Sequence, residues 1–275
     1  MLPAGIEQIG TNAFHRTRWE AEHPDDFILY GDLLLKYKGS AEHVMIPENV
    51  RRIGDGAFRE MHLAAVTFPS GMEEIREEAF LNCRNLSGAV FPASLKRIGE
   101  RAFEMCKNLK QITFEGDVPV CGYNAFWCID AVRALTVRGK TLIPEEYYPD
   151  SRWLYSRWIY VNGMLTCDKQ TFKDADPDKC RMALDYYSMH NNPRFAAVIR
   201  EAAVSVFTRC IQGRRTELIA RLLSYPELLT AQSAERMVKI AIQYAHDTGF
   251  REPLMLVMRA KHEYFGTAEQ QFRLN

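Results

Sequence analysis

The sequence lacks the features that mark membrane spans, secretion and nucleic-acid binding. No apolar run approaches the roughly 18–20 residues that cross a bilayer, and the chain does not open with a basic segment followed by an apolar one. Lys plus Arg and Asp plus Glu number 35 each, so the formal net charge is zero. Residues 1–139 contain 16 basic and 19 acidic residues, and residues 140–275 contain 19 and 16, so neither half has the large basic excess that phosphate backbones attract. We expect no membrane span, no nucleic-acid partner and a cytoplasmic location, or a secreted or cell-surface one if the chain is a fragment.

Motifs of catalysis and cofactor binding are also missing. Gly139-Lys140-Thr141 resembles the end of a phosphate-binding loop, but Ala134 stands where that loop needs its glycine. His262-Glu263 lacks the second histidine of a zinc-binding helix, and neither GxSxG nor a paired CxxC occurs. We therefore predict no catalytic, cofactor-binding or metal-ligating residues, no cofactor and no enzymatic activity.

What the sequence does contain is a repeat of 23 residues, marked by Phe68, Phe91 and Phe114. A fixed period of about 20–30 residues predicts a solenoid, in which no single unit buries its own apolar side chains. Each unit has a short strand whose last residue and the one two places earlier face the core. These strand positions are Val44 and Ile46, Val66 and Phe68, Ala89 and Phe91, Ile112 and Phe114, and Leu135 and Val137.

After the strand, each unit has an apolar pair three residues apart and then an Ala-Phe pair, as in Ala102-Phe103. A glycine follows the apolar pair in most units, and we predict that Gly54, Gly99 and Gly122 occupy turns with positive φ. Cys83 and Cys106 share one position in the repeat. We interpret them as small buried hydrophobic side chains rather than as metal ligands.

By these residues the repeat resembles the BspA-type leucine-rich repeat over about residues 2–139. Asn82-Cys83-Arg84-Asn85-Leu86 and Met105-Cys106-Lys107-Asn108-Leu109 match its pattern closely. The resemblance implies a bacterial source and a right-handed α/β solenoid with short parallel strands on one face. It also implies protein recognition and, in some members, surface adhesion, with no catalytic residues.

We predict three regions along the chain. The solenoid spans 1–140 and contains a variant unit at about 20–43, where 27–37 reads as a hairpin turning at Gly31-Asp32. The uncapped N-terminal solenoid edge is expected to allow self-association. Residues 141–175 are rich in aromatic side chains, and 158–165 reads as a second hairpin with an Asn162-Gly163 turn. This region is either a cap on the last repeat or a binding platform at 147–160.

From Asp176 to the end the pattern becomes helical, with apolar residues three and four apart. The stretch 217–223 maps onto 252–258 at an offset of 35 residues. Helix pairs at this period resemble ankyrin-type repeats, although the usual ankyrin signature is absent. We expect an all-α domain of stacked helix pairs over 176–275.

The candidate binding surface is the strand face turned away from the core. Because successive side chains of a strand point to opposite faces, one residue from each strand lies in a row on this face. The residues just before the strands flank this row. The predicted partner-binding residues are Thr67, Ser87, Val90, Lys110, Thr113, Arg133 and Thr136. In contrast, the pairs Arg51-Arg52, Glu73-Glu74 and Lys96-Arg97 alternate in sign and are predicted to form a structural ionic ladder.

The sequence therefore predicts a non-enzymatic protein-binding or scaffold protein with an unidentified protein partner. Two alternatives stay open, a carbohydrate- or peptide-binding adhesin fragment and an enzyme that uses the aromatic segment 147–160.

Overall fold

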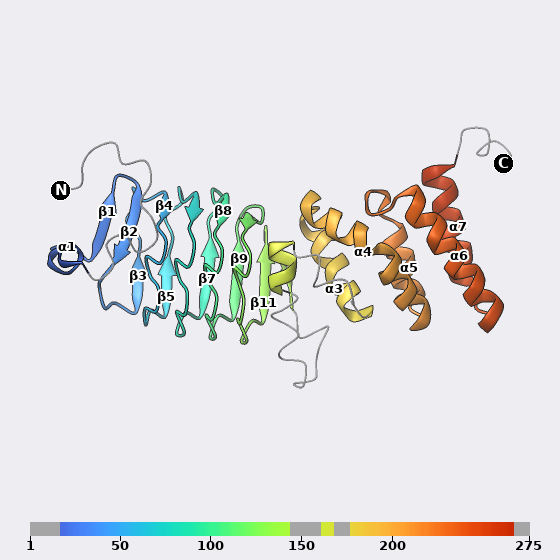
Figure 1. Cartoon of the computed structure of the whole chain (residues 1–275), viewed down its shortest axis with the longest axis horizontal. Coiled ribbons are helices and arrows are strands. Elements are labelled where there is room, and N and C mark those ends of the chain that lie inside the picture. Colours follow the sequence, from blue (N-terminus) through green and yellow to red (C-terminus); the bar gives the residue numbers. More distant parts are fainter. Residues whose placement is uncertain (1–16, 144–160, 168–176, 267–275) are drawn as a thin grey trace. The chain divides into compact units, whose positions relative to one another are not determined.

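The computed structural model describes residues 17–143, 161–167 and 177–266 (Figure 1). The chain divides into two compact units, Met1–Thr166 and Cys167–Asn275. The first unit contains a solenoid of short strands, and the second is helical. Among the described helices, none has the length and the apolar character needed to cross a membrane.

The first unit opens with the short helix α1 (Arg18–Glu22) and a hairpin of β1 (Phe27–Tyr30) and β2 (Leu33–Tyr37). The two strands pair antiparallel, and Gly31 adopts a φ of 60° at the turn. The hairpin predicted over 27–37 is confirmed, since glycine is the residue that takes this conformation without steric cost.

The repeats that follow form parallel ladders on two faces, whereas the sequence predicted strands on one. The first ladder carries the longer strands, seen as arrows in Figure 1. Its strands form a two-stranded sheet of β3 (His43–Met45) and β5 (Ala65–Thr67), followed by a second sheet that contains β7 (Gly88–Phe91), β9 (Gln111–Phe114) and β11 (Ala134–Val137). The antiparallel strand β12 (Lys140–Leu142) pairs with β11 at its end.

The second ladder consists of two-residue strands, which follow β2 in a six-stranded sheet. They are β4 (Arg52–Ile53), β6 (Glu74–Ile75), β8 (Arg97–Ile98) and β10 (Val120–Cys121). The prediction missed this ladder because two residues are too few to show the alternation that reveals a strand.

Stacked phenyl rings fill the space between the two ladders. The ring centroids of Phe58 and Phe80 are 4.7 Å apart, those of Phe80 and Phe103 are 5.0 Å apart, and those of Phe103 and Phe126 are 5.3 Å apart. All four rings are fully buried, as is the alanine before each one. The Ala-Phe pairs therefore form the core that the repeat predicted.

Gly54, Gly99 and Gly122 do not have positive φ, so that prediction was wrong. A Cβ on Gly99 would lie 2.5 Å from the carbonyl carbon of Arg76, which shows that these glycines allow close approach of neighbouring backbones. Positive φ occurs two residues later instead. The residues with positive φ at that position are Gly56, Glu78, Arg101 and Asn124.

Cys83 and Cys106 are buried free thiols, as predicted. The Cys83 thiol donates to the carbonyl oxygen of Phe58 at 3.0 Å, and the Cys106 thiol to that of Phe80 at 3.2 Å. Burial raises the pKa of Cys83 from its ordinary 9.0 to about 12 and raises the pKa of Cys106 well above that ordinary value.

These thiols predict that the first unit loses stability at alkaline pH. The folded state holds each proton more tightly than the unfolded state, so the stabilisation is complete below pH 9.0 and is lost as the pH rises towards 12. Urea unfolding followed at pH 8 and at about pH 10.5 should show the loss, at most ~1.4 kcal/mol per pH unit for each thiol. A Cys83→Ala, Cys106→Ala variant should lose less over the same interval, and an equal loss would contradict the assignment.

The ionic ladder is present in part. Lys96 Nζ lies 2.9 Å from Glu73 Oε2, and Arg97 Nε lies 3.7 Å from Glu74 Oε1. Arg52 pairs with Asp32 at 2.6 Å rather than with the facing Glu74. Because these groups are substantially exposed, each pair contributes no more than about 1 kcal/mol.

The predicted hairpin at Asn162-Gly163 was wrong, because residues 161–166 are helical. Val161, Met164 and Leu165 are buried at spacings of three and four, so the helical pattern outweighs the turn preference of Asn-Gly. Asn162 is only 4% exposed, and its Oδ1 accepts a hydrogen bond from the backbone N–H of Phe126 at 3.0 Å. The rest of the predicted aromatic region, including 147–160, lies outside the described residues.

The second unit confirms the predicted amphipathic helices. They are α3 (Pro177–His190), α4 (Pro193–Gln212), α5 (Thr216–Leu223), α6 (Ala231–Thr248) and α7 (Glu252–Phe265), with the short helix η4 (Pro226–Leu228) before α6. Helix α4 packs against α5 and α6, and α7 packs against α5 and α6. The offset of 35 residues thus relates α5 to α7.

Candidate functional site

The outer face of the first ladder brings the predicted row of residues together. The parallel register places Val90 beside Thr113, and Thr113 beside Thr136. Thr67 lies beside Met45 on the neighbouring pair of strands. We call Met45, Thr67, Val90, Thr113 and Thr136 the strand row.

Ser87, Lys110 and Arg133 form a flanking column just before β7, β9 and β11. The backbone N–H of Lys110 donates to the carbonyl oxygen of Ser87 at 2.9 Å, and that of Arg133 donates to the carbonyl oxygen of Lys110 at 2.8 Å. The three residues therefore follow one another from rung to rung. The register aligns Thr67 with Met45, and Val90, Thr113 and Thr136 with one another, and the backbone bonds align the flanking column. The role of the seven predicted residues in binding stays a prediction.

The strand row is accessible to a partner. Thr67 is exposed, and Val90 is 54% exposed although valine is apolar. Thr113 and Thr136 are half-buried. The residues between them on the same strands, such as Ile112 and Leu135, are fully buried. The alternation that defined the row is thus observed.

Two residues of this face were missed. Met45 is 76% exposed. It follows Val44, whose side chain faces the core, so the alternation along a strand was sufficient to predict that Met45 faces outwards. Thr141 on β12 extends the face, because its Oγ1 lies 2.9 Å from Oγ1 of Thr136. The repeat could not predict the position of Thr141, because β12 is not part of a repeat unit and pairs antiparallel with the last repeat strand, β11.

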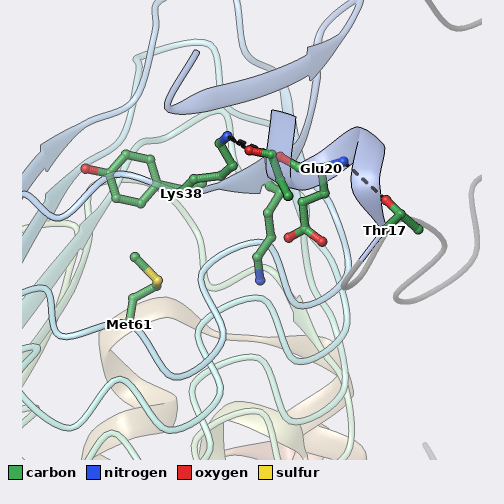
Figure 2. Close-up of a pocket in the computed structure, with 7 residues that line it drawn as sticks. Thr17, Glu20, Lys38 and Met61 are labelled. Carbon is green, nitrogen blue, oxygen red and sulfur yellow. Dashed lines mark hydrogen bonds between the residues drawn. The ribbon is translucent and has the colours of Figure 1, made fainter. Parts of the chain in front are cut away.

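A cavity of 420 Å³ lies between α1 and the hairpin (Figure 2). It is lined by Thr17, Glu20, Ala21, Lys36, Tyr37, Lys38 and Met61. Lys38 Nζ donates to the carbonyl oxygens of Glu20 at 3.1 Å and of His23 at 2.6 Å, so this ammonium group caps the end of α1. No sequence pattern points to this cavity, because its lining residues other than Met61 precede the regular repeats.

Lys36 is the other ammonium group of this cavity. Its Nζ donates to the carbonyl oxygen of Gly56 at 3.1 Å, and burial is the main cause that lowers its pKa. Both lysines thus donate hydrogen bonds to backbone carbonyls. These bonds connect α1, the hairpin and the first rung. This arrangement gives the cavity a structural role.

Metal-ligating side chains do not cluster in the described part of the chain. There, no group of three or more His, Cys, Asp or Glu side chains is placed to hold a metal ion. A second cavity of 320 Å³ lies between turns of successive rungs. It is lined by Glu60, Met61, His62, Asn82, Arg84 and Asn85.

Comparison with known proteins matches residues 31–151 to six copies of the BspA type leucine rich repeat region. No curated protein matches the chain. A leucine-rich repeat protein from Eubacterium ventriosum is 21% identical over 39% of this chain and 30% of its own length, with a TM-score of 0.34. One from Bacteroides capillosus is 24% identical over 41% of this chain and 99% of its own, with a TM-score of 0.36.

A leucine rich cell surface protein from Faecalibacterium prausnitzii is 20% identical over 42% of this chain and 53% of its own length, with a TM-score of 0.28. This chain thus spans less than a third of the Eubacterium protein and about half of the Faecalibacterium protein. These TM-scores are low, so the superpositions cover only part of each structure. The similarity of the repeats therefore rests on the family model. The family match is to the repeats of residues 31–151, which make up less than half of the chain.

Proposed function

We propose that the chain is a non-enzymatic protein-binding or scaffold protein that binds its partner through the strand row and the flanking column. The observation that carries the proposal is an exposed, regularly spaced face on stacked leucine-rich repeats. Stacked repeats create extended surfaces that suit contact with another protein. Val90 and Met45 supply exposed apolar area on this face, and the threonines supply hydroxyl groups.

Several finer features belong to the proposal. We propose a cell-surface location if the chain is part of a longer protein with a leader; the comparisons give no support to the cytoplasmic location expected from the sequence. Self-association through the N-terminal solenoid edge is proposed because β1 forms the first edge of its sheet. The ankyrin-like relation of the helix pairs is proposed from the 35-residue offset between α5 and α7.

A pull-down from the host's lysate and culture medium tests the binding face. The test variant is Lys110→Glu, Thr113→Arg, and the matched control is Lys239→Glu, Gln243→Arg, which changes two exposed residues of α6. We expect a protein that is captured by the wild type and by the control and lost with the test variant. Equal capture by all three proteins would place binding elsewhere and contradict the proposal.

A further inference from the structure

Most charged side chains that connect neighbouring rungs of the solenoid are paired with the opposite sign. The pairs between rungs include Arg52–Asp32, Lys96–Glu73, Arg97–Glu74, Arg101–Glu78 and Arg138–Asp117. Lys110 and Arg133 depart from this rule. They carry the same sign at equivalent positions of consecutive rungs, which the hydrogen bond from Arg133 N to Lys110 O joins at 2.8 Å.

Both side chains are exposed, and neither forms an ion pair or a side-chain hydrogen bond within the described residues. Equivalent positions on neighbouring parallel strands are about 4.8 Å apart, and like charges at that spacing repel each other. The arrangement therefore does not serve the stability of the solenoid. Two unpaired cations beside an exposed strand row form a local positive site on a chain of zero net charge.

We propose that Lys110 and Arg133 anchor a carboxylate-bearing, extended segment of the protein partner, laid across β9 and β11. This inference rests on the proposed function and names the chemistry of the partner. The guanidinium group of Arg133 can bind a carboxylate with two parallel hydrogen bonds, and the ammonium group of Lys110 adds a point charge. Thr113 and Thr136 place hydroxyl groups on the same two strands, where they can bond to the backbone of the segment.

A peptide of Glu-Ser repeats, labelled with a fluorophore, is the probe, and Lys-Ser and Gln-Ser peptides of the same length are its comparisons. The test variant is Lys110→Glu, Arg133→Glu. The control variant, Lys239→Glu, Arg259→Glu, has the same change in net charge on exposed residues of the helical unit. Fluorescence anisotropy measures binding at low salt and at about 0.5 M salt, where charges more than a few ångströms apart are screened.

We expect the acidic peptide to bind the wild type and the control, and to bind the test variant at least ~10-fold more weakly. High salt should weaken the binding, and the basic peptide should not bind the wild type. Equal binding of the acidic peptide to all three proteins, or no binding to the wild type, would overturn the inference. Circular dichroism on each variant confirms that it is folded.

The inference and the proposed function fail in different ways. If the partner captured from the host is lost with a Thr113→Arg variant but retained by Lys110→Glu, Arg133→Glu, the strand face binds the partner without an acidic anchor. The proposed function then stands and the inference is wrong. If both variants retain the partner, the proposed function itself is wrong.

Discussion

Replacing Phe103 with alanine is expected to destabilise the first unit by about 3–5 kcal/mol. Its ring is stacked between those of Phe80 and Phe126, with centroid distances of 5.0 and 5.3 Å, and is fully buried. Alanine would leave a cavity in the middle of the stack, because the backbones of neighbouring rungs are held by hydrogen bonds and cannot close the gap.

Urea unfolding followed by tryptophan fluorescence measures this loss. All four tryptophans of the chain lie within residues 1–166, and Trp19 and Trp127 belong to the described part of the unit that carries the change. Val90→Ala is the control, since that side chain is more than half exposed and should change stability by less than about 0.5 kcal/mol. A loss below about 1 kcal/mol for Phe103→Ala would mean that the phenyl stack does not hold the rungs together.

Replacing Asn162 with leucine is expected to cost about 1–3 kcal/mol by leaving a buried donor unsatisfied. In earlier rungs the backbone N–H of each phenylalanine donates to a carbonyl of the next rung, as Phe80 does to Ala102 at 2.8 Å and Phe103 to Ala125 at 2.7 Å. For Phe126 the acceptor is the side-chain oxygen of Asn162 at 3.0 Å. Asn162 thus replaces the carbonyl of a further rung.

Hydrogen exchange at the Phe126 amide tests this role directly. The wild type should protect it, and Asn162→Leu should expose it to exchange. Thr166→Ala is the control, because the Thr166 hydroxyl donates to the carbonyl oxygen of Asn162 within the same helical segment, at 2.8 Å, and does not contact the Phe126 amide. Unchanged protection of Phe126 in Asn162→Leu would contradict the capping role.

The sequence was sufficient to predict the features that recur in every repeat unit. The phenyl stack, the buried thiols of Cys83 and Cys106, and the alternation that exposes Thr67 and Val90 all recur from repeat to repeat. A local pattern combined with a fixed register therefore places these side chains in three dimensions.

Features that depend on single contacts were not predictable. The bond between Asn162 and Phe126 joins residues 36 positions apart, and no periodicity marks it. The close backbone approach at Gly99 was misread as positive φ, because both requirements exclude a Cβ and select the same residue. That Lys110 and Arg133 have no ion-pair partner among the described residues depends on which side chains reach each other, and that is known only from the fold.

Hydrogen–deuterium exchange on the complex with the captured partner tests the central claim most directly. Binding through the strand row predicts slower exchange in β7, β9 and β11 and in the residues just before them, with little change in the helical unit. Slower exchange confined to α4–α7, with no change in β7, β9 and β11, would show that the leucine-rich repeats are not the binding surface.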